Sequence, residues 1–211
     1  MIRVILVDDH AVVRTGFRML LQSEGSGIEV VGEAADGEAL LDMLNELPAD
    51  VVVMDLSMPG LGGLETLRRL RSRDSAPAVL VLSAHEDTAH PRRALNAGAL
   101  GYLSKRSAPE ALPEAVRAVA AGHRYIDTQT AQLLALSQLN NSASPFDALS
   151  EREFEVFLRL ARGRSVNEIA QQLSLSPSTV GTHLYNIKQK LGAGNQAELT
   201  LLALQWGVLE A

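Results

Sequence analysis

Side chains that could handle a phosphoryl group recur through the first half of the sequence, each directly after a short apolar run. They are Asp8, Asp9, Asp55, Ser83 and Lys105. Carboxylates brought together repel one another unless a cation lies among them, and oxygen ligands with open positions favour Mg²⁺. A lysine opposite the metal could hold a phosphoryl oxygen, and a carboxylate could accept the group as an acyl phosphate. The set therefore predicts phosphoryl transfer to Asp55 in the presence of Mg²⁺, although a single aspartate after a strand is commonly just a capping or turn residue.

The apolar runs before these residues are short and rich in Val, Ile and Leu, as in strands buried on both faces of a parallel sheet. Longer stretches between them carry apolar residues at helical spacing. Five strands alternating with five helices predict a doubly wound α/β sheet in the flavodoxin-like order 2-1-3-4-5. Ligands bind outside the carboxyl ends of the strands in such a sheet, so the polar side chains should converge there. The predicted strands span residues 2–7, 30–34, 51–54, 79–82 and 101–103.

The pattern changes after Gly122, and the remaining chain is predicted to be helical. Ser150 and Glu153 have the spacing of a capping box, and Ser176 offers a cap before Pro177 at the first helical position. A short helix, a turn and a longer helix between residues 166 and 191 are typical of a helix-turn-helix. The expected helices span residues 127–139, 151–162, 166–173, 176–191 and 195–206. We therefore expect an α/β domain over residues 1–121, a linker with a helix over residues 122–148, and an all-α four-helix domain over residues 149–211.

The composition excludes several classes of protein. The 211 residues contain no cysteine, which excludes disulfides, thiolate metal sites and cysteine nucleophiles. The apolar runs are far shorter than the roughly 18 residues of a membrane helix, and the N-terminus lacks a signal-peptide pattern, so we expect a cytoplasmic protein with no membrane partner. The net charge of −6 alone argues against nucleic acid as a partner. Residues 159–194, however, carry five basic side chains against the single acidic Glu168, a local net charge of +4.

The motifs of the first half resemble the receiver domain of bacterial two-component response regulators. They are Val7-Asp8-Asp9-His10, Met54-Asp55-Leu56-Ser57-Met58-Pro59-Gly60, Val81-Leu82-Ser83-Ala84 and Gly101-Tyr102-Leu103-Ser104-Lys105. The resemblance implies that Asp55 is the phosphoacceptor and Lys105 the phosphate contact. It also implies that Ser83 and Tyr102 are switch residues, which move together on phosphorylation. The implied Mg²⁺ ligands are Asp8, Asp9, Asp55 and the backbone carbonyl of Ser57.

The C-terminal part resembles the LuxR-type DNA-binding domain over residues 149–157, 163–173 and 176–192. The whole chain thus resembles a NarL/FixJ-type response regulator, and the resemblance implies that the helix over residues 176–191 reads the major groove. Relatives often carry a lysine at the position of Gly181, so direct readout would rest on its neighbours. The groove-facing positions implied by the resemblance are Gly181, Thr182 and Tyr185, and direct readout is expected from Thr182, Tyr185 and Asn186. Ser178 is a further expected DNA-binding residue on this side of the helix. Expected phosphate contacts are Arg164, Ser165, Thr179, Lys188 and Lys190.

The resemblance implies a transcriptional response regulator. A sensor histidine kinase would phosphorylate Asp55, and a change in receiver dimerisation or interdomain contacts would control binding to promoter DNA. A homodimer through the last helix and/or the receiver would raise DNA affinity, and RNA polymerase is a further expected partner. Phosphotransfer onto itself and dephosphorylation are the only reactions expected, so the chain would not be an enzyme. Two alternatives stay open: a phosphorylation-independent regulator and an Asp-nucleophile phosphohydrolase. The presence of Ser57 argues against the phosphohydrolase, because no second acidic residue follows Asp55 at this position.

Two prolines depart from the expected helical pattern. Pro91 falls where the fourth helix should start, and Pro113 lies one turn after Pro109 at the expected start of the fifth. Because proline interrupts helical hydrogen bonding, we expect these helices to begin late, near Arg92 and Glu114. Both positions lie on the surface that should respond to phosphorylation. We therefore put forward the hypothesis that this receiver dimerises differently from its relatives.

Overall fold

The computed structural model describes residues 1–84, 87–139, 144–173, 175–206 and 208–209 of the chain. These residues form two compact units, the first holding most of residues 1–135 and the second most of residues 136–211. Residues 140–143 of the expected linker and Ser174 of the expected turn lie outside the described residues. No described helix is long and apolar enough to cross a membrane.

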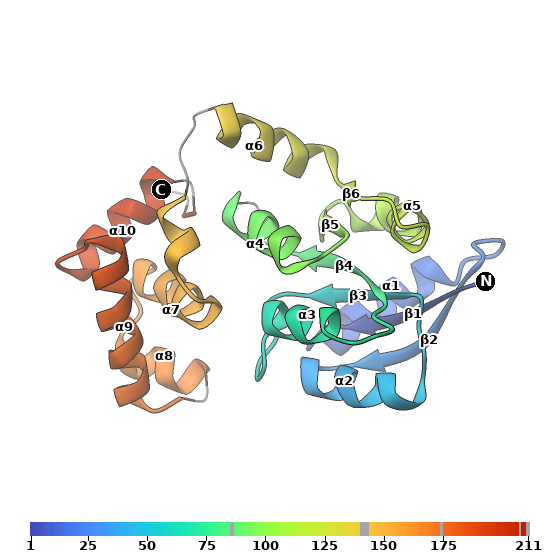
Figure 1. Ribbon diagram of the computed structural model, residues 1–211, viewed down its shortest axis with the longest axis horizontal. Helices are drawn as coiled ribbons and strands as arrows, with labels where there is room; N and C mark the ends of the chain where they lie inside the picture. Colours follow the sequence, from blue (N-terminus) through green and yellow to red (C-terminus); the bar gives the residue numbers. More distant parts are fainter. Residues whose placement is uncertain (85–86, 140–143, 174, 207, 210–211) are drawn as a thin grey trace. The chain divides into compact units, whose positions relative to one another are not determined.

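The first unit is built around a parallel sheet of six strands (Figure 1). Its strand order, β2-β1-β3-β4-β5-β6, confirms the predicted order for the first five strands. The sixth strand is only two residues long and falls in the segment expected to be linker, where it is too short to show strand periodicity. The strands are β1 (Ile2–Val7), β2 (Ile28–Ala34), β3 (Val51–Asp55), β4 (Ala78–Ser83), β5 (Gly101–Ser104) and β6 (Tyr125–Ile126).

Helices cover both faces of this sheet, which confirms the doubly wound fold. One apolar cluster joins Leu21 of the first helix and Leu112 of the fifth to one face of the strands. A second cluster joins residues such as Leu40, Leu67 and Ala94 from the other helices to the opposite face. The helices are α1 (Ala11–Leu21), α2 (Gly37–Glu46), α3 (Gly63–Arg71), α4 (Ala89–Ala97) and α5 (Ala108–Ala120).

The expected late starts of the fourth and fifth helices are wrong. α4 begins at Ala89, which puts Pro91 in the first turn, where a backbone N–H has no partner within the helix. α5 begins at Ala108 and takes Pro109 at one of its first two positions. Pro113 lies inside α5, where it removes one hydrogen bond without ending the helix. The proline spacing was therefore a poor guide to where these helices begin.

The second unit contains the four predicted C-terminal helices. Their cap residues are polar: Ser150 and Ser165 each form a capping box, Ser176 accepts from Thr179 N, and Asn195 accepts from Glu198 N. The helices are α7 (Glu151–Ala161), α8 (Val166–Gln172), α9 (Pro177–Leu191) and α10 (Gln196–Gln205), preceded by α6 (Thr128–Leu139) and the 3₁₀ turn η1 (Pro145–Ala148).

Aromatic side chains form the centre of the second unit's core. Phe146 of η1 is almost fully buried, with its ring centroid 4.7 Å from that of Phe157 on α7. The same ring meets Trp206 edge-on at 6.4 Å. Val180 and Ile187 of α9 are fully buried in this core, as their helical spacing predicts. The packed core of this unit therefore reaches back to Phe146, within the segment expected to be linker.

Candidate functional site

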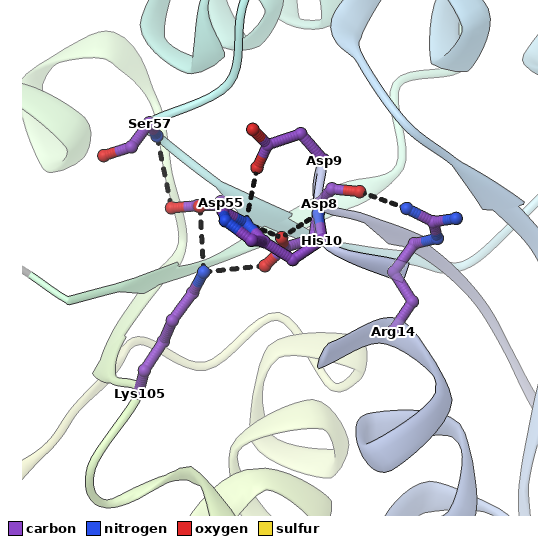
Figure 2. Close-up of polar contacts among 7 residues, drawn as sticks. All are labelled: Asp8, Asp9, His10, Arg14, Asp55, Ser57 and Lys105. Carbon is purple, nitrogen blue, oxygen red and sulfur yellow. Dashed lines mark hydrogen bonds and ion pairs between the residues drawn. The ribbon is translucent and has the colours of Figure 1, made fainter. Parts of the chain in front are cut away.

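The acidic cluster, defined as Asp8, Asp9 and Asp55, lies at the carboxyl ends of β1 and β3 (Figure 2). Asp8 is 4% exposed and Asp55 3% exposed, whereas Asp9 is exposed. Lys105 follows β5 and inserts its ammonium between the two buried carboxylates, 2.7 Å from Asp8 Oδ2 and 2.8 Å from Asp55 Oδ2. The fold thus brings together side chains that are 97 and 50 residues apart in sequence.

The charges of this group constrain what it can bind. Burial disfavours the charged form of Lys105, but the hydrogen bonds and negative charges of Asp55 and Asp8 outweigh it and raise the pKa of this side chain. Lys105 is therefore a permanent cation at neutral pH. One ammonium facing three carboxylates leaves an excess of negative charge, and these oxygen donors fit a hard divalent cation.

His10 joins the acidic cluster, although sequence reasoning assigned it no role. Its Nδ1 lies 2.8 Å from Asp9 Oδ1 and 3.2 Å from Asp8 Oδ1. Among the described residues, ligand atoms of Asp8, Asp9 and His10 lie within 4.8 Å of one another, close enough to hold one metal ion. His10 directly follows the two aspartates in sequence, and this adjacency was the signal that could have indicated its place in the site. Ser57, an expected ligand through its carbonyl, donates its backbone N–H to Asp55 Oδ1 at 3.1 Å.

The two expected switch residues lie on the neighbouring strands β4 and β5 and are both fully buried. Ser83 ends β4, and its backbone carbonyl accepts a hydrogen bond from Lys105 N at 2.8 Å. Tyr102 lies in the same apolar cluster as Met54 of β3 and Ala94 of α4. Ser83 is thus joined through the backbone to the residue that holds the two carboxylates, and Tyr102 lies on the side of the sheet that α4 covers.

Arg14 and Glu33 form hydrogen bonds that hold the backbone of Asp8 in the acidic cluster. Sequence reasoning missed both residues. Arg14 Nη1 donates to the backbone carbonyl of Asp8 at 2.5 Å, and Arg14 Nε donates to Glu33 Oε2 at 3.1 Å. Arg18 also donates to Glu33, at 2.6 Å. Burial raises the pKa of Glu33, but the hydrogen bonds and charges of Arg18 and Arg14 outweigh it, so that this pKa is lowered. α1 and β2 are thereby linked to the end of β1.

The helix-turn-helix of the second unit presents a polar surface on α9, on the side away from Val180 and Ile187. Tyr185 is 64% exposed, the largest exposed aromatic surface of the unit. The hydroxyl of Thr182 donates to the carbonyl of Ser178 at 3.1 Å, within the helix. An added Cβ at Gly181 would meet nothing within 4 Å, so this position is open. Ser178, Thr179 and Thr182 are exposed, whereas Gly181 and Asn186 are half-buried.

The expected phosphate contacts all have partners within the domain. Lys188 Nζ donates to the carbonyl of Gly194 at 2.9 Å, and Lys190 Nζ lies 2.5 Å from Glu153 Oε2. Arg164 pairs with Glu168 at 3.3 Å, and this glutamate also accepts from the backbone and side chain of Ser165. Hydrogen bonds from Ser165 lower the pKa of Glu168. The local positive charge is thus partly compensated by nearby carboxylates.

Comparison with known families and relatives agrees with both units. The response regulator receiver domain matches residues 4–117, and the bacterial regulatory proteins of the luxR family match residues 147–203. The response regulator UvrY of Escherichia coli K12 is 44% identical over 213 residues, which cover 100% of this chain and 97% of UvrY. The response regulator GacA of Pseudomonas aeruginosa is 45% identical over 214 residues, which cover 100% and 99%.

Solved structures also match this chain over both of its units. The RcsB response regulator of Salmonella typhimurium shares 29% identity at a TM-score of 0.71, over 100% of this chain and 98% of that one. An RcsB–DNA complex shares 30% identity at a TM-score of 0.61, over 95% and 96% of the two chains.

The doubly wound domain with its acidic cluster, followed by a helix-turn-helix, defines a two-domain regulatory protein that joins a receiver domain to a DNA-binding domain of the luxR family. The chain belongs to the response regulator family and is a transcription regulator of the NarL/FixJ type.

Proposed function

We propose that Asp55 is the phosphoacceptor and that a sensor histidine kinase is the donor. The observation that carries this proposal is the buried Asp55 carboxylate, 2.8 Å from the ammonium of Lys105 and next to a second buried carboxylate. An oxygen of Asp55 forms the bond to phosphorus as the bond to the donor nitrogen of the kinase breaks. Lys105 then exchanges its contact with the carboxylate for one with a phosphoryl oxygen.

The proposed cation is Mg²⁺, held by Asp8, Asp9, Asp55 and the backbone carbonyl of Ser57. When bound, it would neutralise the phosphoryl oxygens during transfer. The oxygen donors and the excess negative charge of the cluster support this choice. The Arg14 contact with the Asp8 carbonyl fixes the backbone of one ligand, and the Ser57 amide orients the Asp55 carboxylate.

Ser83 and Tyr102 would respond to the new charge on Asp55. A phosphoryl group adds about −1.5 to −2 charge and strong acceptor oxygens, so it attracts the Ser83 hydroxyl as well as Lys105. Tyr102 lies on β5, the strand next to β4, and is paired with Val81, two residues before Ser83. A rearrangement of these two residues would alter the surface formed by α4, β5 and α5, and with it dimerisation or interdomain contacts.

The output of this switch would be binding of promoter DNA by α9. Base contacts would come from Thr182, Tyr185 and Asn186, with Ser178 and Gly181 on the same DNA-facing side of α9. Phosphate contacts would come from Arg164, Ser165, Thr179, Lys188 and Lys190. The likeness to RcsB, whose solved structures include two dimers bound to two DNAs, supports a homodimer on DNA. We place this activity in the cytoplasm, with RNA polymerase as a further partner and no enzymatic turnover.

Labelling with radioactive acetyl phosphate and Mg²⁺ tests the phosphoacceptor. Wild type should take up one phosphoryl group per chain, and Asp55→Asn, which keeps the size of the side chain, should take up none. Asp42→Asn, at an exposed position of α2, is the matched control and should label normally. Equal labelling of Asp55→Asn and wild type would remove Asp55 from this role. Continuous release of many equivalents of phosphate would instead favour the phosphohydrolase alternative.

A further inference from the structure

Asp127 is a buried carboxylate for which the proposed function has no role. It directly follows β6 and is 6% exposed. Its Oδ1 accepts the backbone N–H of Thr130 at 3.0 Å, as expected of a residue that caps α6. Its Oδ2 accepts two more hydrogen bonds, from the hydroxyl of Thr130 at 2.8 Å and from the backbone N–H of Ser104 at 3.1 Å. The bond to Ser104 reaches back 23 residues to β5 and has no part in capping.

This bond continues the hydrogen-bond ladder of β5 and β6 after β6 has ended. Tyr125 N donates to the carbonyl of Leu100, and Asp127 N to that of Tyr102. The next bond of a parallel pair would join Ser104 N to the backbone carbonyl of Asp127. That carbonyl already accepts from Ala131 N at 2.9 Å, in the first turn of α6. The carboxylate of Asp127 therefore takes the place of the Asp127 carbonyl as the acceptor for Ser104 N. It adds one more hydrogen bond, or rung, to the ladder between β5 and the β6 side.

The added rung lies next to Lys105. Ser104 precedes Lys105 directly, and Lys105 N is bonded to the Ser83 carbonyl on the other side of β5. The segment that carries the ammonium is thus held from β4 by Ser83 and from the β6 side by Asp127. A serine, which is also a favoured cap, has a single side-chain oxygen, whereas a carboxylate has two oxygens with about four acceptor positions. The use of Asp at this position is explained by its second task.

We infer that Asp127 is a positioning residue for Lys105 and that it joins the acidic cluster to α6. The inference rests on the proposed function, because it assigns Lys105 the contact with the phosphoryl group. A shift of Lys105 towards a phosphoryl oxygen moves the Ser104 amide, and the same carboxylate holds the first turn of α6. Since the chain continues from α6 towards the helix-turn-helix, the state of Asp55 acts on the start of this connecting helix.

The variant Asp127→Ser separates the two tasks, because serine keeps a cap for α6 and removes the bond to Ser104. Thr130→Val is the matched control, since it removes the hydroxyl bond to the same carboxylate and keeps both backbone donors. We expect Asp127→Ser to lower the maximal rate of Asp55 labelling by acetyl phosphate about tenfold. The Mg²⁺ concentration for half-maximal rate should stay unchanged, because Asp8, Asp9 and Asp55 follow other strands. Thr130→Val should stay within about twofold of wild type in rate.

A double-mutant cycle shows whether Asp127 acts through Lys105. In a Lys105→Ala background, Asp127→Ser should have no further effect on the labelling rate, whereas independent roles would make the two losses multiply. Wild-type labelling kinetics in Asp127→Ser would overturn the inference while leaving the proposed function intact. Failure of wild type to label at Asp55 would instead overturn the proposed function itself.

A measurement on the wild-type protein covers the case in which Asp127→Ser does not fold. Amide hydrogen exchange at Ser104 and Thr130 is followed by NMR with and without acetyl phosphate and Mg²⁺. The inference expects the protection of both amides to change together on phosphorylation. An unchanged Thr130 amide beside a changed Ser104 amide would show that α6 does not sense the acidic cluster, and would overturn the link.

Discussion

Lys190 on α9 forms an ion pair with Glu153 on α7, with Nζ 2.5 Å from Oε2. Glu153 is 5% exposed and also accepts the backbone N–H of Ser150 at 2.7 Å, so one carboxylate caps α7 and holds α9. A buried charge with its partner removed is costly, so this pair matters for the stability of the domain. An expected phosphate contact thus has a structural partner in the absence of DNA.

The first prediction concerns how the stability of the second unit depends on pH. Burial raises the pKa of Glu153, but the hydrogen bonds from Lys190 and Ser150 outweigh it, so this pKa lies below the ordinary 4.5. A carboxylate whose pKa is lowered in the folded state stabilises the fold fully above pH 4.5. This contribution is lost as the pH falls through the folded-state pKa. Glu153→Gln should cost about 1.5 kcal/mol at pH 7 and progressively less below pH ~4.5.

Fluorescence of Trp206, the single tryptophan, measures this effect in the full chain, because the indole packs on Phe146 in the second unit. Urea titrations at several pH values would give the unfolding free energy of the second unit. Glu155→Gln is the control, since Glu155 and its partners Arg152 and Arg159 are more exposed than Glu153, so that these pairs should contribute less to stability. A gap between Glu153→Gln and wild type that does not change with pH would contradict the prediction.

The second prediction separates the two lysines of α9. Within the described residues the Lys188 ammonium contacts only the neutral carbonyl of Gly194, whereas Lys190 is held by a carboxylate. The ammonium of Lys188 can therefore turn to a DNA phosphate at a lower cost than that of Lys190. Lys188→Gln should reduce the slope of log K against log salt by about 0.9, the value for one phosphate contact. Lys190→Gln should change this slope less and lower the unfolding free energy more. Filter binding over a salt series, with duplexes selected from random DNA, distinguishes the two. Equal salt slopes and equal unfolding free energies for the two variants would contradict this prediction.

The third prediction concerns Gly181, whose position on α9 is open to a side chain. Gly181→Ala should stabilise the second unit by about 0.5–1 kcal/mol, because glycine weakens a helix interior. Gly181→Lys should strengthen binding to any duplex and steepen the salt dependence, since it adds a cation where Thr182 and Tyr185 are expected to contact bases. Gly181→Gln has similar length without charge and serves as the control. A salt slope unchanged by the lysine would place position 181 away from the DNA.

The fourth prediction concerns α10, which exposes two leucines. Leu201 is 57% exposed and Leu204 is 37% exposed. If the homodimer forms through this helix, Leu201→Glu should lower the affinity for a two-half-site duplex at least tenfold and leave binding to one half-site unchanged. Gln205→Glu adds the same charge at an exposed position of the same helix and should have little effect. Sedimentation in the presence of DNA measures the stoichiometry, and a two-to-one complex with Leu201→Glu would exclude this interface.

Most of the sheet could be predicted because β3, β4 and most of β1 are apolar runs and the intervening helices carry apolar stripes. β6 could not, because two residues show no period and Tyr125 pairs only once β5 is in place. The start of α5 was misjudged because proline was taken as a barrier, whereas Pro109 lies at a permitted position and Pro113 is tolerated inside the helix. Local sequence rules lose their force where tertiary packing stabilises a helix.

The acidic cluster was predictable for a different reason. Residues directly after parallel strands must meet at one edge of the sheet, so Asp8, Asp55 and Lys105 could be placed together before any distance was known. Arg14, Glu33 and Asp127 could not be found in this way. Their roles depend on hydrogen bonds between side chains and backbone groups that are distant in sequence, and no spacing rule predicts such contacts.

The shortness of β6 also affects how the sheet meets other chains. An exposed edge strand offers unpaired N–H and C=O groups, to which a strand of another molecule can add. β6 covers the β5 edge at Gly101 and Tyr102, and the Asp127 carboxylate takes up the Ser104 N–H beyond it. β6 itself extends for only two residues before the chain turns into α6. This side of the sheet therefore offers few free backbone groups for edge-to-edge pairing with a strand of another molecule.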